Sequence, residues 1–213
     1  MNLLIMGAPG AGKGTQADVV SKQLNIPVIS TGNILWAAAN SGSELGNQIK
    51  GLMEQGALVS DEIIIDIVKE RIQENDCKNG FILDGMPRNV SQAKALDENG
   101  VIIDKALFIE VSDDEILNNR MTGRLTCPNC RVTYHKKSNP PKVDGICDKC
   151  GSKLTVRQDD NYKTMQNRLK VFHSETEPLL AHYESVGKLC RICGEEPISV
   201  ITQQILKALE DQK

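Results

Sequence analysis

The chain has 213 residues, of which 40% are hydrophobic, 25% are charged and only 3% are aromatic. This length predicts one α/β domain carrying insertions, rather than two full domains, with a core of aliphatic side chains. The net charge of −3 argues against a protein held to nucleic acid by bulk charge, and no apolar run approaches the roughly 20 residues of a membrane span. Because the N-terminus has no signal-peptide pattern, we expect a cytoplasmic protein.

Short apolar runs alternate with amphipathic segments along the chain, which is typical of a parallel sheet covered by helices. We expect strands at residues 3–6, 28–29, 81–83, 106–111 and 188–192. Helices are expected at 16–24, after a cap at Ser60, after capping boxes that pair Asn89 with Gln92 and Ser112 with Glu115, and from Glu196-Pro197 onward.

Two segments interrupt this alternation. We expect residues 30–59 to form a helical insertion after the second strand. Residues 125–161 have no helical periodicity and carry three prolines, two glycines and four cysteines. We therefore expect residues 1–29, 60–124 and 162–213 to form the core domain, from which the two insertions project.

A glycine-rich turn lies between the first strand and the first helix, with the sequence Gly7-Ala8-Pro9-Gly10-Ala11-Gly12-Lys13-Gly14-Thr15. In such a loop the backbone N–H groups converge on a phosphate, the helix N-terminus favours negative charge, and the lysine adds a point charge. The general pattern has Ser or Thr directly after Gly-Lys, whereas here Gly14 precedes Thr15. The turn predicts a phosphate site, and a glycine-rich turn without a ligand is the alternative.

Six of the seven cysteines form three Cys-x-x-Cys pairs. The pairs Cys127/Cys130 and Cys147/Cys150 are separated by 16 residues, which fits a tetrahedral zinc ribbon. A segment so poor in apolar residues could hardly fold without a metal, so we predict a structural Zn²⁺; four free thiols or two disulfides are the alternatives. The third pair, Cys190/Cys193, falls on a predicted strand with its side chains on opposite faces, and we expect it to pack rather than bind metal.

The order Gly-Lys-Gly-Thr in the glycine-rich turn resembles the nucleoside monophosphate kinases. Further segments resemble adenylate kinase in order and spacing along nearly the whole chain: Ser30-Thr31-Gly32, Asp84-Gly85-Met86-Pro87-Arg88 with Gln92, Thr122-Gly123-Arg124, Arg157-Gln158-Asp159-Asp160-Asn161, and Arg168. The cysteine-bearing insertion resembles the lid of the long-form bacterial enzymes. This resemblance implies the P-loop kinase fold, a five-stranded parallel sheet flanked by helices, with a nucleoside-monophosphate-binding (NMP) insertion at 30–59 and a zinc-ribbon-like lid at 125–161.

The resemblance also implies the Mg²⁺-dependent reaction ATP + AMP = 2 ADP. Phosphoryl transfer needs positioning and cancellation of charge rather than a nucleophile on the protein. The cations implied to serve it are Lys13, Arg88, Arg124, Arg157 and Arg168. Asp84 is implied to order water around Mg²⁺, while Asp159 and Asp160 are implied to hold the lid arginines in place.

The two nucleotides are implied to have separate binding sets. The ATP set consists of Gly10, Ala11, Gly12, Lys13, Gly14, Thr15, Arg124, Thr133, Tyr134 and Glu196. The AMP set consists of Thr31, Trp36, Ala57, Leu58, Val59, Gly85, Met86, Pro87, Arg88, Gln92, Arg157 and Arg168. The implied cofactors are structural Zn²⁺ and Mg²⁺ with ATP, and the implied partners are ATP and AMP, with no nucleic acid or membrane, for a chain that acts as a monomer.

Several positions depart from the family pattern on the AMP side. Trp36 replaces an arginine that the resemblance implies on the AMP phosphate, and Asn33 replaces an acidic neighbour of that arginine. Met86 replaces an aromatic residue and Asn89 a threonine. These changes keep open a kinase for another nucleoside monophosphate and a nucleotide-binding sensor with degraded transfer activity. A zinc-ribbon nucleic-acid binder is disfavoured by the acidic balance of the chain.

Overall fold

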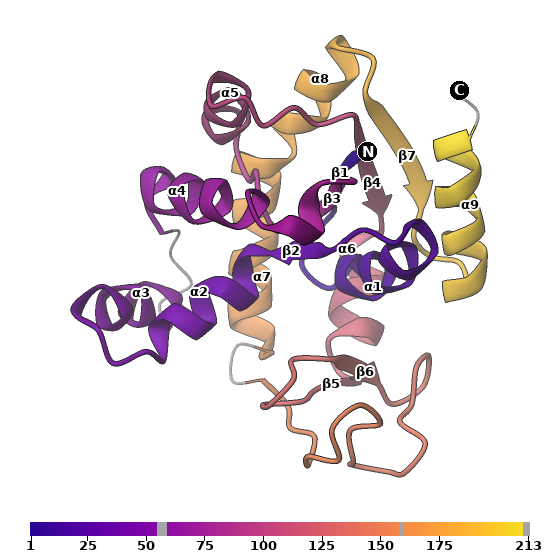
Figure 1. The fold of residues 1–213 in the computed structure, drawn as a ribbon. Coiled ribbons are helices and arrows are strands. Elements are labelled where there is room, and N and C mark those ends of the chain that lie inside the picture. The colour runs from indigo at the N-terminus through magenta and orange to yellow at the C-terminus, as the bar shows by residue number, and fades with distance from the viewer. Residues whose placement is uncertain (55–58, 158–159, 211–213) are drawn as a thin grey trace.

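The computed structural model of the protein describes residues 1–54, 59–157 and 160–210. Its central sheet has five parallel strands in the order β2-β3-β1-β4-β7 (Figure 1). The strands are β1 (Asn2–Met6), β2 (Val28–Ser30), β3 (Phe81–Asp84), β4 (Lys105–Glu110) and β7 (Leu189–Cys193). Each predicted strand is present to within one residue at either end, so the predicted α/β class and five-stranded parallel sheet are confirmed.

Helices cover both faces of this sheet. One face packs on α1 (Lys13–Leu24) and α9 (Ile198–Glu210). The other packs on α4 (Asp61–Ile72), α5 (Val90–Glu98), α7 (Tyr162–Val171) and α8 (Pro178–Ser185). The insertion after β2 contains α2 (Thr31–Ala39) and α3 (Glu44–Glu54), and the short connecting turns are η1 (Asn75–Cys77), α6 (Asp113–Glu115), η2 (Ile116–Arg120) and η3 (Phe172–Thr176).

The pattern of β1 explains how one strand serves two cores. Leu3 and Ile5 belong to the cluster formed with α1 and α9, whereas Leu4 and Met6 belong to the cluster on the opposite face. Successive side chains of a strand point to opposite faces, and a parallel sheet is buried on both. The continuous apolar run at the start of the chain is therefore the signature of a central parallel strand.

Three details of the helix ends differ from the predictions. Ser60 occupies the N-cap of α4, but its side chain makes no capping hydrogen bond. Asn89 does cap α5, accepting a hydrogen bond from the Gln92 backbone N–H at 2.8 Å, yet the Gln92 side chain turns to the Arg88 N–H instead of closing the capping box. Pro197 lies just before α9, which begins at Ile198, so the proline acts at the cap rather than inside the first turn.

The predicted lid segment has no helix among its described residues, as its sequence indicates. It contains a two-stranded antiparallel sheet of β5 (Arg124–Thr126) and β6 (Thr133–His135), at the foot of the molecule in Figure 1. Its small core consists of Leu125, Tyr134 and Leu154 packed with Cys127 and Cys147. Elsewhere too, the described part of the chain contains no helix long and apolar enough to cross a membrane.

Candidate active site

The phosphate loop, residues 7–15, runs from the carboxyl end of β1 into the first turn of α1. Gly10 and Gly12 have φ values of 89° and 95°, a left-handed conformation that a side chain would strain. Gly12 is also the N-cap of α1 and provides no side chain to cap the first turn. The N–H groups at the start of α1 therefore face the loop, where they can bind an anion.

Lys13 folds back over this loop. Its Nζ donates hydrogen bonds to the carbonyl oxygens of Gly7 at 2.8 Å and Ala8 at 2.9 Å. Burial lowers the pKa of Lys13 from 10.5 to about 8; the charge of Asp84 opposes this shift, whereas nearby arginines reinforce it. Those arginines are Arg88, Arg168 and Arg124. The structure thus brings four of the five predicted cations into one electrostatic neighbourhood, which favours the binding of an anion.

Asp84 lies at the carboxyl end of β3, facing this group of cations. Its Oδ2 is 3.8 Å from the position that a Cβ on Gly14 would occupy, so the carboxylate approaches the phosphate loop. Burial raises the pKa of Asp84, and the charges of Lys13 and Arg88 oppose that rise. A single buried carboxylate beside a phosphate loop fits Mg²⁺, which proteins hold through one or two carboxylates together with substrate phosphates.

Arg88 is held in place by its own loop. Its Nε donates to the carbonyl of Gly85 at 2.8 Å, and its backbone N–H donates to Oε1 of Gln92 at 2.6 Å. Burial lowers the pKa of Arg88, with Asp84 acting against the shift. Beside it, the Thr31 hydroxyl at the start of α2 donates to the carbonyl of Asp84 at 3.3 Å. The NMP insertion therefore begins next to Arg88.

Gln92 is fully buried and its amide is oriented from both ends. In addition to the bond from Arg88, its Nε2 donates to Oδ1 of Asp61 at 2.6 Å. Asp61 lies in the first turn of α4, and no local spacing links it to Gln92 31 residues later. Its hydrogen bond with Gln92, a predicted AMP-binding residue, is a feature that sequence reasoning missed.

A second arginine lies at the point where the chain enters the lid. Arg124 forms an ion pair with Asp160 through its Nε at 2.8 Å and also through Nη2, and the Asp160 side chain is fully buried. A bidentate arginine–carboxylate pair fixes the plane of the guanidinium. Asp159 lies outside the described residues, as do Ala57 and Leu58. Arg157 precedes this pair in a turn in which the Asp160 N–H donates to its carbonyl at 3.1 Å.

The other predicted binding residues are more scattered. Thr133 is exposed on β6, and Glu196 is exposed before α9. Tyr134 is buried in the lid, where its hydroxyl accepts a hydrogen bond from the Asp148 N–H at 2.8 Å. Val59 and Met86 are buried, and Trp36 is partly buried on α2. Thr15 lies in the first turn of α1, and Gly85 and Pro87 lie between β3 and α5.

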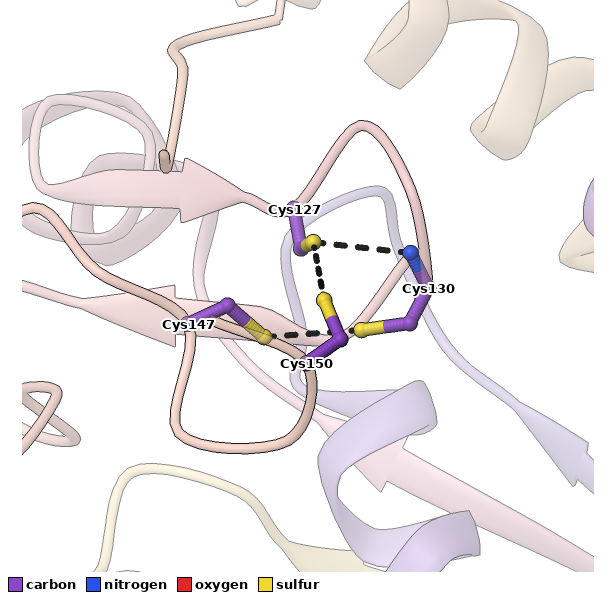
Figure 2. A group of neighbouring side chains, drawn as sticks. All are labelled: Cys127, Cys130, Cys147 and Cys150. Atoms are coloured by element: carbon purple, nitrogen blue, oxygen red, sulfur yellow. Dashed lines mark hydrogen bonds between the residues drawn. The ribbon is translucent and has the colours of Figure 1, made fainter. Parts of the chain in front are cut away.

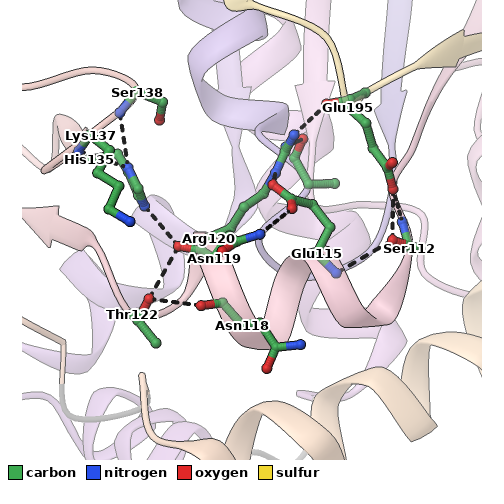
Figure 3. A network of polar contacts seen from close by, with 12 residues as sticks. Ser112, Glu115, Asn118, Asn119, Arg120, Thr122, His135, Lys137, Ser138 and Glu195 are labelled. Atoms are coloured by element: carbon green, nitrogen blue, oxygen red, sulfur yellow. Dashed lines mark hydrogen bonds and ion pairs between the residues drawn. The ribbon is translucent and has the colours of Figure 1, made fainter.

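Arg120 is a structural residue of the site that no motif indicated. Its Nη1 donates to the carbonyl of Ala11 in the phosphate loop at 2.9 Å, its Nη2 donates to the carbonyl of Gly194, and its Nε lies 3.4 Å from Glu115 (Figure 3). One guanidinium thereby ties the phosphate loop to η2 and to the turn after β7. Its partners are up to 109 residues away in sequence, so no spacing pattern could reveal it.

Of the predicted capping box between Ser112 and Glu115, only the hydrogen bond to the Ser112 hydroxyl is formed. The Ser112 hydroxyl accepts from the Glu115 N–H at 3.4 Å, but the Ser112 N–H donates to Glu195 at 2.9 Å (Figure 3). These bonds from Ser112 lower the pKa of Glu195. Glu195 takes the role that the capping box assigns to Glu115 because the turn after β7 packs against the start of α6.

His135 links the lid to the core. Its Nδ1 accepts hydrogen bonds from the N–H groups of Lys137 and Ser138, both at 3.2 Å. The ring proton therefore lies on Nε2, which donates to the carbonyl of Asn119 at 3.0 Å (Figure 3). A Cβ at Gly123 would lie 2.3 Å from this ring, so the glycine leaves room for the histidine at the point where the lid begins.

The four lid cysteines form one cluster (Figure 2). Their sulfur atoms lie within 4.8 Å of one another, with Cys127 and Cys150 3.4 Å apart and Cys130 and Cys147 also 3.4 Å apart. All four are free thiols, so the disulfide alternative is not realised in this structure. Tetrahedral ligation at about 2.3 Å from zinc needs sulfur separations of about 3.8 Å, which small side-chain adjustments would provide. The cluster is compatible with a metal ion.

The remaining cysteines do not form a second cluster among the described residues. Cys190 packs against the core beside Ile192, whereas Cys193 is exposed at the end of β7. The predicted separation of this pair onto opposite faces is therefore confirmed.

Comparisons with known proteins agree with this geometry. A family model described as adenylate kinase matches residues 5–188. The chain is 49% identical over 213 residues to the adenylate kinase of Caldicellulosiruptor bescii, covering 98% of this chain and 99% of that protein. It is 48% identical over 217 residues to that of Acetivibrio thermocellus, covering all of both, and 46% identical over 213 residues to that of Lachnospira eligens, covering 98% and 100%. The chain belongs to the adenylate kinase family.

Proposed function

We propose that this chain catalyses the reversible, Mg²⁺-dependent transfer ATP + AMP = 2 ADP and so balances the adenine nucleotides of the cell. The observation that carries this proposal is the set of cations around Lys13. Burial and three nearby arginines lower the pKa of Lys13 to about 8. Such a cluster is costly in a protein without a ligand, and it suits a transition state with charge spread over transferring phosphoryl oxygens.

On the ATP side, the phosphate loop binds the polyphosphate through its N–H groups, and Lys13 exchanges the carbonyls of Gly7 and Ala8 for phosphate oxygens. Arg124, held by Asp160, and Arg157 approach from the lid. Asp84 would hold Mg²⁺ through its water ligands, and the ion would neutralise charge on the phosphates. The retention of all these residues argues against a sensor with degraded transfer activity.

On the AMP side, Arg88 and Arg168 bind the monophosphate, and Thr31, Gly85 and Gln92 place the nucleoside. The Gln92 amide uses one N–H on Asp61 and one lone pair on the Arg88 N–H, which leaves it one donor and one acceptor toward an adenine edge. Because Gln92 is fully buried, the NMP insertion has to open before adenine can reach it.

The division into a core, an NMP insertion at 30–59 and a lid at 125–161 is part of the proposal. The lid closes over ATP as one body and excludes water from the transferring group. Cys127, Cys130, Cys147 and Cys150 would hold Zn²⁺, which gives the lid the rigidity that its small apolar core cannot supply. We further propose that the protein acts as a cytoplasmic monomer.

The test is a coupled assay that supplies ATP, Mg²⁺ and one of AMP, CMP, UMP or GMP. The proposal expects kcat/KM for AMP to exceed that of each other monophosphate by about 100-fold or more, since a site that hydrogen-bonds adenine leaves its polar groups unpaired with another base. A preference for a pyrimidine or guanine monophosphate would assign the chain to another substrate. Absence of transfer with all four would refute the enzymatic proposal.

A further inference from the structure

One contact joins the lid to the NMP insertion. The guanidinium carbon of Arg131 lies 4.6 Å from the ring centroid of Trp36, with the cation over the indole face. Arg131 belongs to the turn between Cys130 and β6, whereas Trp36 lies on α2. A cation over tryptophan is the most favourable form of this interaction, and it is stronger where solvent is partly excluded, as both side chains are here.

The backbone of Arg131 shows that this side chain is present at a cost. Its φ of 62° is left-handed, a conformation in which glycine is the unstrained residue. The turn is fixed by two hydrogen bonds, from the Arg131 N–H to the carbonyl of Cys127 at 3.0 Å and from the Cys127 N–H to the carbonyl of Val132 at 2.9 Å. The turn holds Arg131 in a conformation that strains a residue with a side chain, and strain retained in this way points to a role for that side chain.

The position of Trp36 indicates what that role is. Trp36 follows Thr31 by five residues on α2, about 7.5 Å along the helix axis. The Thr31 hydroxyl lies 3.0 Å, and the Arg88 Nη2 3.7 Å, from the position that a Cβ on Gly85 would occupy. The helix that carries Trp36 therefore starts at Arg88, one of the groups assigned to the AMP phosphate, and α2 itself contains no cationic residue.

We propose that Trp36 and Arg131 form a clasp in which the lid, through Arg131, supplies α2 with the guanidinium that its own sequence lacks, for binding the phosphate of AMP. This rests on the proposed function and adds a substrate-binding residue to it. A guanidinium stacked on a ring directs its N–H bonds within its own plane, away from the indole, which is the geometry that phosphate contacts use.

The clasp couples the binding of AMP to the binding of ATP. The cation for the AMP phosphate arrives with the lid, so AMP binds more tightly when the lid is closed over ATP. By linkage, ATP then binds more tightly when AMP is present, by the same factor.

The first experiment is a kinetic comparison of Arg131→Gly with the wild type. Loss of a charge-assisted contact predicts a rise of about 10- to 100-fold in KM for AMP at saturating ATP. The KM for ATP, measured with AMP far below saturation, should change less than twofold, because the coupling acts on ATP only when AMP is bound. The melting temperature should not fall, because glycine accepts the left-handed turn without strain. Arg191→Gln is the matched control, since it removes a guanidinium that lies 5.8 Å from the Phe108 ring at an exposed site on β7. It should leave both KM values unchanged.

A charge-relocation series separates phosphate binding from simple packing. Trp36→Arg alone should not improve AMP binding, because it places a second guanidinium against Arg131. The double variant Trp36→Arg with Arg131→Gly should restore KM for AMP to within about threefold of the wild type. Trp36→Leu should weaken AMP binding about as much as Arg131→Gly, and combining these two should add little, as expected for residues that act as one unit.

Two further measurements make failure of the clasp distinguishable from failure of the proposed reaction. Trp36 is the single tryptophan, so its emission should differ between Arg131→Gly and the wild type and match the wild type in Arg191→Gln. AMP binding by calorimetry, with a non-hydrolysable ATP analogue present, requires no turnover. An unchanged AMP affinity in Arg131→Gly with the ATP analogue present, or an equal loss of affinity for the ATP analogue measured without AMP, would overturn the clasp. A wild type that binds AMP without transferring phosphate would instead refute the proposed function.

Discussion

Replacing Lys13 with methionine should separate the catalytic value of this residue from its cost to stability. Lys13 is the cation closest to the phosphate loop carbonyls and is desolvated. A group that acts on charge developing in the transition state contributes to turnover more than to binding. We expect kcat to fall by about 10²- to 10³-fold, the loss typical of removing one such donor. The KM for ATP should rise by only about tenfold or less.

The stability effect has the opposite direction and depends on pH. The fall of the Lys13 pKa from 10.5 to about 8 corresponds to at most about 3 kcal/mol against burying the charged amine. Below pH 8 both the folded and unfolded chains carry this proton, so the full cost is present. Between about pH 8 and 10.5 the unfolded chain binds the proton that the folded chain has lost, so the stability of the wild type rises with pH.

Urea unfolding of the two proteins between pH 7 and 10.5 measures this directly. The free energy of unfolding of the wild type, relative to Lys13→Met, should increase by up to about 3 kcal/mol across that range. The wild-type kcat/KM for ATP should fall above about pH 8 as Lys13 loses its proton in the free enzyme. Lys22→Met, on the exposed side of α1, serves as the control for turnover. A constant stability difference, or near-normal turnover in Lys13→Met, would refute the assignment of Lys13.

Three further predictions concern the lid and the contact between η3 and α6. Cys150→Ser should reduce bound zinc from about one ion per chain to none by elemental analysis and lower the melting temperature, while ATP binding persists; a wild type without stoichiometric metal would contradict this. Asp160→Asn should lower kcat by about 10- to 100-fold, because Arg124 loses its charged partner, with AMP binding in the absence of ATP unaltered. Hydrogen bonds to two carboxylates raise the pKa of His173 above 6.5, so its contribution is present below that pH and is lost as pH rises through the folded value. His173→Gln should therefore lower the melting temperature more at pH 6 than at pH 9, and equal losses would contradict the assignment.

Features encoded over short stretches of sequence were predictable. The apolar run before the phosphate loop identifies β1, because a central parallel strand is buried on both faces and needs no polar positions. The two cysteines of each Cys-x-x-Cys pair in the lid lie close together because each pair folds as a tight local turn. Asp84 and Arg88 could be placed near Lys13 because the carboxyl ends of neighbouring parallel strands meet at one edge of the sheet.

Features that depend on long-range packing were not predictable. Arg120 reaches Ala11 across 109 residues, and Gln92 reaches Asp61 across 31. A charged or polar side chain has no periodicity that reveals its partner, so neither the role of Arg120 nor the contact between Gln92 and Asp61 could be predicted. Arg131 is the clearest example: the sequence shows the missing charge at position 36, but only the packed structure shows which arginine lies against the tryptophan.

The measurement that tests the account most directly starts from ADP alone. Purified protein given ADP and Mg²⁺ should produce ATP and AMP in equal amounts, and mixtures of ATP and AMP should approach the same equilibrium from the other side. Lys13→Met should do so at a rate lower by about 10²-fold or more. ADP that stays unchanged, or that yields AMP and inorganic phosphate without ATP, would contradict the assignment of the site to phosphoryl transfer between two nucleotides.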